Sequence, residues 1–251
     1  YQPHANFTLN NVCQNDTLFV NNLSTLGGGT MAYNWNFSDG FSTTTNPAKH
    51  KYLNFGNYTV SVTLTSDSGC VDTMSRAVHV GKNNVLAFSS TPVCEGNTTS
   101  FVNTTDSTGS GGVNWLWNFG DNGTNTSYST THTYTAGGTY SVLLKATTVD
   151  GCIDTLRKNA RVNYQPHANF TLNNVCQNDT LFVNNLSTLG GGTMAYNWNF
   201  GDGFSTTSNP AKHKYVNYGN YTVSVTLTSD SGCVDTLSKA VHVGKNNVLA
   251  F

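Results

Sequence analysis

Apolar and polar residues alternate along several short stretches of this sequence, which is the pattern of β-strands with one buried face. From Tyr58 to Leu64 the apolar residues take every second position, and Thr and Ser take the positions between them. The same alternation predicts further strands at residues 18–20, 33–37, 71–80 and 140–146. Clusters of Gly, Asn, Asp and Ser separate these stretches, and none carries an apolar stripe at helical spacing. The pattern therefore predicts an all-β protein.

The sequence repeats itself with two periods. Residues 1–88 return as residues 164–251 with 82 of the 88 residues identical, which sets a long period of 163 residues. A shorter period of 81 or 82 residues appears in a Trp-Asn-Phe triplet that begins at Trp35, Trp117 and Trp198. We therefore predict three domains and the start of a further repeat, at residues 1–81, 82–163, 164–245 and 246–251. The first and third domains are called type A, and the divergent middle domain is called type B.

The composition excludes several functions. Only 10% of the residues are charged and the net charge is −1, so there is no basic surplus for binding nucleic acid. No apolar run approaches the ~20 residues of a membrane span, and the first residues lack the basic and apolar regions of a signal peptide. Asn (34) and Thr (37) are abundant, and the 12% of aromatic residues favours β-structure over disorder. We expect the chain to be a window onto a longer array.

A set of spaced motifs resembles the PKD (polycystic kidney disease-type) domain. In the third repeat the motifs are the Trp-Asn-Phe-Gly-Asp-Gly segment at residues 198–203, Pro210-x-x-His213-x-Tyr215, and the alternating stretch from Gly219 to Val225. The first repeat departs from the pattern at Ser38, where the family usually has Gly, and the type B repeat lacks the Pro. The resemblance implies three tandem immunoglobulin-like β-sandwich domains in an extended array, on a cell-surface or secreted protein. It implies no reaction.

Six cysteines are distributed two to a repeat, at Cys13, Cys70, Cys94, Cys152, Cys176 and Cys233. Their even number and near-constant spacing predict one disulfide within each domain, Cys13–Cys70, Cys94–Cys152 and Cys176–Cys233, formed in an oxidising compartment. The alternative is a bond between repeats, such as Cys70 to Cys94. A zinc site is not expected, because the sequence has no Cys-x-x-Cys pair or Cys/His cluster.

Aromatic residues are candidates for the core or for a sugar-binding surface. Trp35, Trp117 and Trp198 alternate in phase with the Phe two positions later, so we predict that they fill the three cores with each indole N–H paired. The alternative is a sugar-stacking platform. Three histidines that precede a Tyr by two residues are interpreted as structural, namely His50, His132 and His213. Four others lie near repeat ends, where a contact between domains is possible: His4, His79, His167 and His242.

Acidic residues in tight turns raise the question of a metal. Asp39, Asp121 and Asp202 lie beside Gly in such turns, and some PKD-like domains bind calcium near this segment. The neighbouring position, often Asp in the family, is Asn here, which lowers the ligand charge available to a hard cation. The simpler interpretation is an Asp that accepts a hydrogen bond from its own turn backbone.

Asp-Thr or Asp-Ser followed by an apolar residue or Thr recurs along the chain. It resembles an O-glycosylation signal that one phylum of Gram-negative bacteria uses on exported proteins, and it marks Thr17, Thr73, Ser107, Thr155, Thr180 and Thr236. The alternative is that these pairs are part of the PKD pattern itself.

These observations predict a non-enzymatic extracellular structural protein, since no nucleophile elbow or paired-carboxylate motif is present. We expect a cell-surface filament, stalk or adhesin that associates with itself and carries glycans. The alternative function is an array of carbohydrate-binding or spacer modules attached to a secreted hydrolase.

Overall fold

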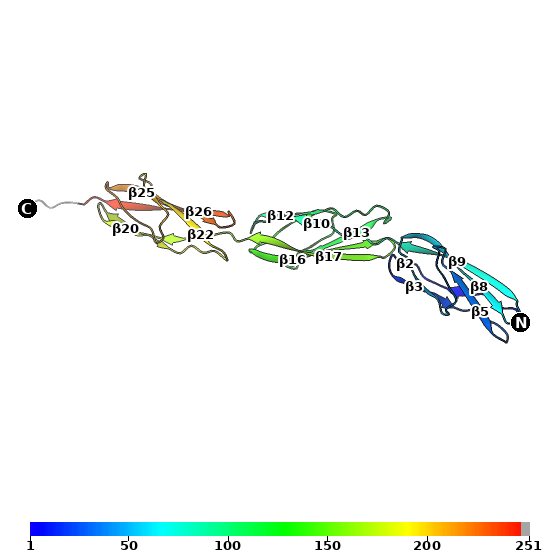
Figure 1. Cartoon of the computed structure of the whole chain (residues 1–251). Coiled ribbons are helices and arrows are strands. Elements are labelled where there is room, and N and C mark those ends of the chain that lie inside the picture. Colours follow the sequence, from blue (N-terminus) through cyan, green and yellow to red (C-terminus); the bar gives the residue numbers. More distant parts are fainter. Residues whose placement is uncertain (247–251) are drawn as a thin grey trace, which may run out of the picture. The chain divides into compact units, whose positions relative to one another are not determined.

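The computed structural model describes residues 1–246, which form β-strands, turns and loops. Residues 247–251, which hold most of the predicted start of a further repeat, lie outside the described part of the chain. Among residues 1–246 no helix is long and apolar enough to cross a membrane. The strands follow one another along the chain in three successive groups, as the colours of Figure 1 show.

The chain divides into two compact units, and the boundary between them runs through the type B repeat. Unit 1 comprises Tyr1–Ser89, Val102–Thr130 and Val142–Lys158. Unit 2 comprises Ser90–Phe101, Thr131–Ser141 and the chain from Asn159 onward. Each unit thus combines one complete type A repeat with part of the type B repeat, so each contains one junction between repeats.

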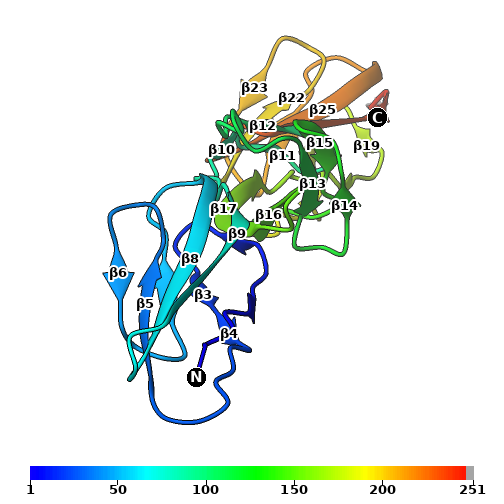
Figure 2. The ribbon, with the colours of Figure 1, turned by 90° about the vertical axis from the view of Figure 1, so that its right-hand side faces the viewer.

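The first repeat lies in unit 1 and has nine strands. They are β1 (Phe7–Thr8), β2 (Val12–Cys13), β3 (Thr17–Phe19), β4 (Asn21–Asn22), β5 (Met31–Asn36), β6 (Ser42–Thr43), β7 (Lys49–Lys51), β8 (Gly56–Ser66) and β9 (Val71–Gly81). One sheet has the order β2-β9-β8-β5-β6, of which Figure 2 labels β9, β8, β5 and β6. The opposite layer consists of the antiparallel pairs β1–β4 and β3–β7. This is a two-layer immunoglobulin-like sandwich in which several strands have only two residues.

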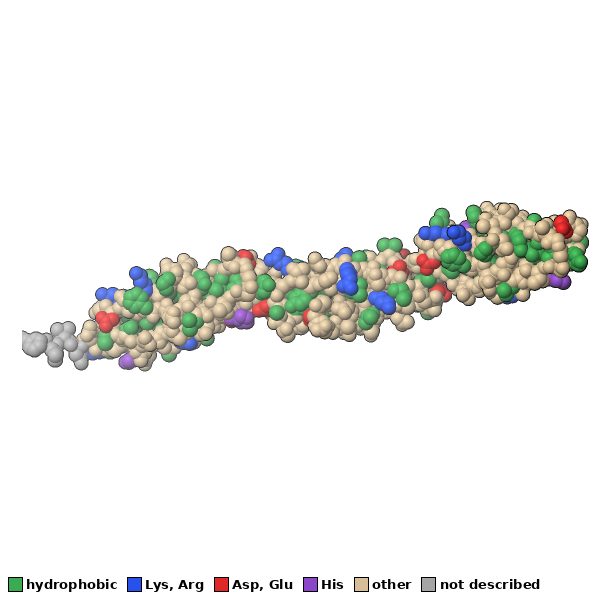
Figure 3. All heavy atoms as spheres, turned by 90° about the horizontal axis from the view of Figure 1, so that it is seen from below, with side chains coloured by type: hydrophobic (Ala, Val, Ile, Leu, Met, Phe, Trp, Pro, Cys, Tyr) green, Lys and Arg blue, Asp and Glu red, His purple; other side chains and the backbone are tan. Residues whose placement is uncertain are grey.

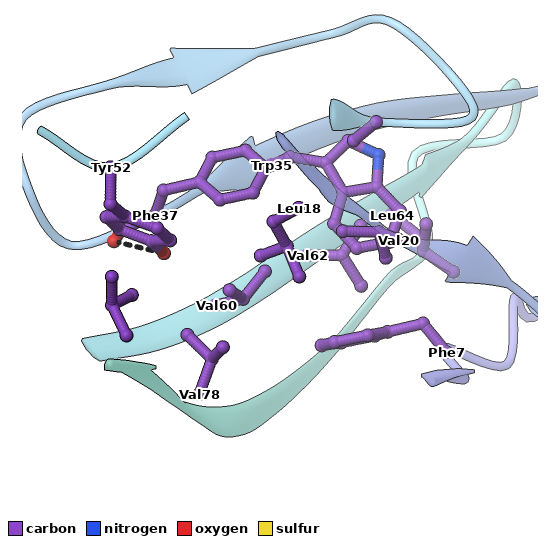
Figure 4. Close-up of a cluster of buried hydrophobic side chains, with 12 residues drawn as sticks. Phe7, Leu18, Val20, Trp35, Phe37, Tyr52, Val60, Val62, Leu64 and Val78 are labelled. Carbon is purple, nitrogen blue, oxygen red and sulfur yellow. Dashed lines mark hydrogen bonds between the residues drawn. The ribbon is translucent and has the colours of Figure 1, made fainter. Parts of the chain in front are cut away.

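The core of the first repeat lies between these layers (Figure 4). Val60, Val62 and Leu64, the apolar side of the β8 alternation, are fully buried, as the pattern predicts. Trp35 is also fully buried, and the ring of Phe7 meets it edge-on with the centroids 5.2 Å apart. The two sheets therefore pack through the residues whose period of two marked them as inward-facing.

The three predicted core tryptophans, Trp35, Trp117 and Trp198, are all fully buried. The prediction that each indole N–H is hydrogen-bonded holds only in the type B repeat, where Nε1–H of Trp117 donates to the Ser127 carbonyl at 2.9 Å. The indole nitrogens of Trp35 and Trp198 are buried with no hydrogen-bond acceptor in the structure. The Ser127 carbonyl comes from the segment after the short strand Thr124–Asn125, where the two repeat types differ in sequence.

The type B repeat has eight strands. They are β10 (Phe88–Ser90), β11 (Val93–Cys94), β12 (Thr98–Asn103), β13 (Val113–Asn118), β14 (Thr124–Asn125), β15 (Thr130–Thr133), β16 (Gly138–Thr148) and β17 (Ile153–Asn163). The larger sheet has the order β11-β17-β16-β13-β14, which matches the first repeat strand for strand. In unit 1, β13 pairs with β16, and in unit 2, β11 pairs with the end of β17.

The third repeat lies in unit 2 and repeats the first. Its strands are β18 (Phe170–Thr171), β19 (Val175–Cys176), β20 (Thr180–Phe182), β21 (Asn184–Asn185), β22 (Met194–Asn199), β23 (Ser205–Thr206), β24 (Lys212–Lys214), β25 (Gly219–Ser229) and β26 (Val234–Gly244). The sheet order is β19-β26-β25-β22-β23, with the pairs β18–β21 and β20–β24 opposite. The chain is therefore three tandem immunoglobulin-like β-sandwich domains.

Candidate functional site at the junctions between repeats

A disulfide joins the first repeat to the second within unit 1. Cys13 and Cys152 are bonded, with their Cα atoms 5.7 Å apart and a sequence separation of 139 residues. Cys13 is the last residue of β2, and Cys152 lies in the turn that leads into β17. The bond therefore adds a second covalent connection to the main chain that already links the two repeats.

Unit 2 contains the same connection one repeat later. Cys94, the last residue of β11, is bonded to Cys233, which precedes β26, again 139 residues away. Cys70 and Cys176 are exposed and are the two cysteines without a disulfide in the described chain. In sequence terms, Cys70 corresponds to Cys152 and Cys233, and Cys176 corresponds to Cys13 and Cys94.

The predicted pairing within each domain (Cys13–Cys70, Cys94–Cys152 and Cys176–Cys233) is thus wrong, as is the alternative of Cys70 with Cys94. The reason lies in the parallel pairing of β2 with β9, which places Cys13 beside Gly81 at the end of β9. Cys70 lies before the start of β9, and eleven residues of extended strand span roughly 33 Å. A disulfide tolerates a Cα separation of about 7 Å at most, so the two cysteines of one sandwich cannot meet.

A glycine lets the turn of the second repeat approach the first. A Cβ atom on Gly81 would lie 2.7 Å from Sγ of Cys152 and 2.8 Å from Cβ of Asp150. The turn is held by its own backbone bonds, since the Thr148 N–H donates to the Cys152 carbonyl at 2.9 Å. Gly81 is therefore required by close packing at the first junction.

Polar contacts surround the first disulfide. Nε2 of His79 lies 3.2 Å from Oδ2 of Asp150 in the next repeat, so this histidine near a repeat end does contact its neighbour. Lys82 lies over the ring of Phe55, 5.6 Å from its centroid, and its ammonium donates to the Thr108 carbonyl of the type B repeat. The main-chain linker is thus tied to both repeats of unit 1.

The second junction uses different residues for the same purpose. Glu95 accepts a hydrogen bond from the Gly137 N–H, and its Oε1 lies 3.4 Å from Nε2 of His167 in the third repeat. The ring of Tyr164 lies against Gly190 and Gly191 of the loop before β22, where any Cβ atom would collide with it. A cavity of about 300 Å³ lies beside Tyr164. The cross-repeat polar pair is therefore His–Asp at the first junction and Glu–His at the second.

The turn aspartates are occupied by groups of their own domain. Oδ1 of Asp202 accepts the Phe204 N–H at 3.1 Å, and Oδ2 lies 2.7 Å from Nε2 of His213. Burial raises the pKa of Asp202, but the hydrogen bonds from His213 and from the Phe204 N–H outweigh it, so the pKa is below its usual value. Asp39 makes the same two contacts, with Phe41 and His50.

The ring of His213 stacks on Phe204, with the centroids 4.6 Å apart, and it meets Tyr215 edge-on. Asp121 accepts the Gly123 N–H of its own turn at 2.9 Å. Each turn carboxylate therefore acts as the backbone acceptor that the simpler interpretation predicts. Across residues 1–246 there is no group of three or more His, Cys, Asp or Glu side chains placed to hold a metal ion.

An exposed aromatic patch is the surface feature that the sequence patterns missed. In the first repeat, Phe19 is 70% exposed and Phe41 is 43% exposed, and they border a hollow of about 330 Å³. Lys49 and Lys51 of β7 border it as well. The third repeat has the same hollow, about 320 Å³, with Phe182, Phe204, Lys212 and Lys214. We call these the type A patches, because the corresponding positions in the type B repeat are Ser100, Gly123, Thr131 and Thr133.

Comparison with known families decides the classification of the chain. A family model described as the PKD domain matches it three times, at residues 1–80, 84–164 and 163–243. The chain belongs to the PKD domain family. The resemblance carried by its motifs is thereby confirmed.

Individual relatives share parts of the chain. A stretch of 53 residues is 42% identical to Collagenase ColA of Clostridium perfringens (strain 13 / Type A), covering 21% of this chain and 5% of the collagenase. The solved PKD1 domain of Vibrio anguillarum Epp is 30% identical, covers 34% of this chain and 99% of that domain, and has a TM-score of 0.31. The PKD1 domain of the Vibrio cholerae metalloprotease PrtV is also 30% identical, with coverages of 32% and 98% and a TM-score of 0.29.

PKD domains are non-catalytic modules, and residues 1–246 hold no catalytic feature. Disulfide bonds persist in oxidising environments, so the two bonds and the PKD domains indicate an extracellular or secreted protein.

The candidate glycosylation residues lie on the surface of the PKD domains. Thr17, Thr73, Thr155, Thr180 and Thr236 are exposed, and Ser107 is half-buried. The preceding aspartate has a structural function at several of these sites. The Asp72 carboxylate accepts the Ala5 N–H at 2.7 Å and the Thr73 N–H at 2.9 Å, and Asp235 makes the corresponding two bonds in the third repeat. The Ala5 N–H and then the Thr73 N–H hold the pKa of Asp72 below its usual value. The aspartate of the Asp-Thr pair thus stabilises the fold, and the threonine remains exposed.

Proposed function

We propose that this chain is a segment of a non-enzymatic extracellular structural protein in which tandem PKD domains form a cell-surface filament, stalk or adhesin. The observation that carries the proposal is the pair of disulfides between consecutive repeats, Cys13–Cys152 and Cys94–Cys233. A disulfide between neighbouring domains is a covalent connection through which tension can pass from one domain to the next.

The connectivity determines how tension passes along such an array. In a longer array with the same pattern, a covalent path runs from Cys13 across the disulfide to Cys152 and then through 24 residues of main chain to Cys176, from which the next disulfide continues. A second path of the same kind starts from Cys94 and Cys233. The 57- or 58-residue segment between the two cysteines of each domain, which includes most of the sandwich, lies outside both paths. Tension is then borne by disulfides and short linking segments, while the cores stay folded.

The surface composition suits self-association. Only 10% of the residues are charged, and the face in Figure 3 is covered mainly by uncharged polar side chains and backbone. Asn and Thr offer hydrogen-bond donors and acceptors without long-range repulsion, which favours lateral packing or covalent glycans. The candidate glycan sites are the six residues named above, Thr17, Thr73, Ser107, Thr155, Thr180 and Thr236.

Electron microscopy of native material tests the proposal. Fibres should appear whose axial repeat matches the two-domain unit of 163 residues, or a simple fraction of it in a symmetric bundle. Isolated compact particles would contradict it. The intact mass of the same native material tests the glycans, since a mass equal to that of the polypeptide rules them out.

A second function is favoured by the type A patches, which could hold a sugar against exposed Phe41 and Phe204 between lysines. In that case the chain is a binding and spacer array, and the partial match to a collagenase places PKD domains in at least one enzyme of that kind. A glycan array separates the two functions. Binding to a defined polysaccharide that is lost when both Phe41→Ala and Phe204→Ala are present would support the binding array.

A further inference from the structure

A hollow of about 500 Å³ lies at one end of the third repeat, next to the unpaired Cys176. Its lining includes Asn174, Asp179, His242 and Gly244. The imidazole of His242 is oriented by the Asn220 side chain at 2.8 Å, and its backbone N–H donates to Asn174 at 2.8 Å. The hollow is therefore lined by residues on and beside β19 and by residues of β26 that hydrogen bonds hold in place.

The corresponding residues of the first repeat show what fits in such a hollow. Cys13, His79 and Gly81 correspond to Cys176, His242 and Gly244, and His79 has the same orientation through Asn57 and Asn11. In unit 1 these residues receive the turn of the type B repeat. Its Cys152 bonds to Cys13, and its Asp150 lies 3.2 Å from His79.

The space around Gly244 is a second observation that points to a docking site. At the first junction, Gly81 must lack a side chain because Cys152 and Asp150 come within 2.8 Å of its Cβ position. A Cβ on Gly244 would meet only the Val175 carbonyl, at 4.0 Å, and no left-handed backbone angle requires glycine there. The third repeat thus has the space that the first repeat needs for the type B turn.

We propose that this hollow is a docking site for the Val-Asp-Gly-Cys turn of a further type B PKD domain, and that Cys176 forms a disulfide with the cysteine of that turn. The inference rests on the proposed array function and deepens it by naming the partner and the bond. Cys70 is the complementary half of another junction, in the position of Cys233, and takes the first cysteine of a type B repeat.

The turn sequence explains why the partner should be type B. The type A turn runs Ser66-Asp67-Ser68-Gly69-Cys70, so it has Ser68 where the type B turn has Asp150. A type A turn in the hollow would therefore place a Ser hydroxyl, and no carboxylate, at the position of Asp150. Its one carboxylate, that of Asp67, accepts the Thr30 N–H of its own repeat. Conversely, the end of the type B repeat has Arg161 and Asn163 in place of His79 and Gly81, and it pairs with a type A repeat through Glu95 and His167 instead. The residues at the junctions therefore specify that type A and type B repeats alternate.

Bond formation needs an oxidant, which we assign to the class of low-molecular-weight disulfides such as oxidised glutathione. The two thiols lose two protons and two electrons as the S–S bond forms, and the oxidant takes them up as its own S–S bond breaks to give two thiols. The stepwise route is attack of one thiolate on the oxidant, followed by attack of the second thiolate on the mixed disulfide.

The test replaces residues 245–251 of the chain by one further repeat, so that the added repeat follows Gly244 as Lys82 follows Gly81. One extension is a copy of residues 82–163, and the matched control is a copy of residues 1–81. Both proteins are oxidised in a glutathione buffer, digested without reduction, and mapped by mass spectrometry. In the type B extension, Cys176 should be bonded to the copy of Cys152, leaving as free thiols Cys70 and the copy of Cys94.

The control measures the preference for type B. A partly exposed His–carboxylate pair contributes about 0.2–1 kcal/mol, so the Cys176 bond should resist reduced glutathione about 1.4- to fivefold more strongly in the type B extension than in the control. His242→Ala should abolish this difference. A free Cys176 thiol in the type B extension, or equal resistance in the two extensions, would overturn the proposal.

Failure of this inference and failure of the array function are distinguishable. Fibres in native material together with a free Cys176 in the type B extension would reject the docking site alone. A bonded Cys176 in native material that forms no fibres would reject the filament alone.

Discussion

Removing the disulfides one at a time should change the length of the unfolded chain in a pattern that only overlapping loops produce. Cys13–Cys152 and Cys94–Cys233 each close a loop of 139 residues, and the two loops share the residues between Cys94 and Cys152. With both bonds intact, the covalent path has 12 residues to Cys13, 58 from Cys152 back to Cys94, and 18 from Cys233 to Phe251. The path is thus 88 residues long, against 250 in the reduced chain.

These counts convert into lengths that can be measured. At about 3.5 Å per residue, the fully stretched chain should reach ~310 Å with both bonds and ~875 Å with neither. Breaking either bond alone leaves one loop of 139 residues closed and a path of 111 residues, or ~390 Å. The first bond broken therefore adds only ~80 Å, and the second adds ~490 Å.

Optical tweezers with handles at the two termini can follow this series. Cys70→Ser with Cys176→Ser gives a background in which no free thiol can exchange with the disulfides. Cys13→Ser with Cys152→Ser, Cys94→Ser with Cys233→Ser, and all four together then supply the intermediate and fully opened chains without a free thiol. The background itself should have the same stretched length as the unmodified chain, because neither Cys70 nor Cys176 is bonded.

Pairing within each domain would give a different series. Cys94→Ser would then release 58 residues, or ~200 Å, in place of ~80 Å, and Cys176→Ser alone would lengthen the chain by a similar amount. Either result would refute the connectivity described here, and the force-transmitting function that depends on it.

Three further predictions concern the third PKD domain. Trp198→Ala should lower the free energy of unfolding by about 3–5 kcal/mol in chemical denaturation, because the ring is fully buried; unchanged stability with lost sugar binding would contradict its core position. The lowered pKa of Asp202 stabilises the fold above the unfolded-state value of about 4, and this contribution is lost as the pH falls through the folded pKa. Asp202→Asn should accordingly flatten the acid side of the stability profile, and an unchanged profile would refute this. Burial, and then the charges of Asp202 and Tyr221, raise the pKa of Tyr215, so the contribution of this group to stability should be complete below pH ~10 and decrease above it. Tyr215→Phe should remove that decrease, and it should lower the free energy of unfolding by about 1 kcal/mol because the hydrogen bond to the Phe200 carbonyl is lost. If the stability of the Tyr215→Phe variant still decreases above pH ~10, another group causes the decrease.

Much of the fold could be read from local pattern. The alternation from Tyr58 to Leu64 identifies a half-buried strand, because side chains of an extended chain point alternately to opposite faces. The Trp-Asn-Phe triplets place Trp35 in the core by the same period. Pairing of the indole N–H could not be inferred, since the acceptor for Trp117 comes from Ser127 in a separate segment.

The type A patches illustrate a second limit. Phe19 and Phe41 come from different segments, and each alone resembles an ordinary apolar position in a strand or turn. They form one exposed surface only when β3 and β7 pair and bring Lys49 and Lys51 beside them. The type B repeat lacks both Phe and both Lys, and this difference between the repeat types was the one sign of the patch in the sequence.

The amino-acid sequence by itself determined the sandwich class and the family, because these depend on periods and motifs within about 80 residues. Only the tertiary structure decided which cysteines meet. Spacing could not distinguish the two possibilities, since the bonded pairs are both 139 residues apart and the wrong pairs are nearly as regular, at 57 or 58. The choice depends on β2 running parallel to β9, which places Cys13 at the end of the domain where the next repeat begins and a full strand length away from Cys70.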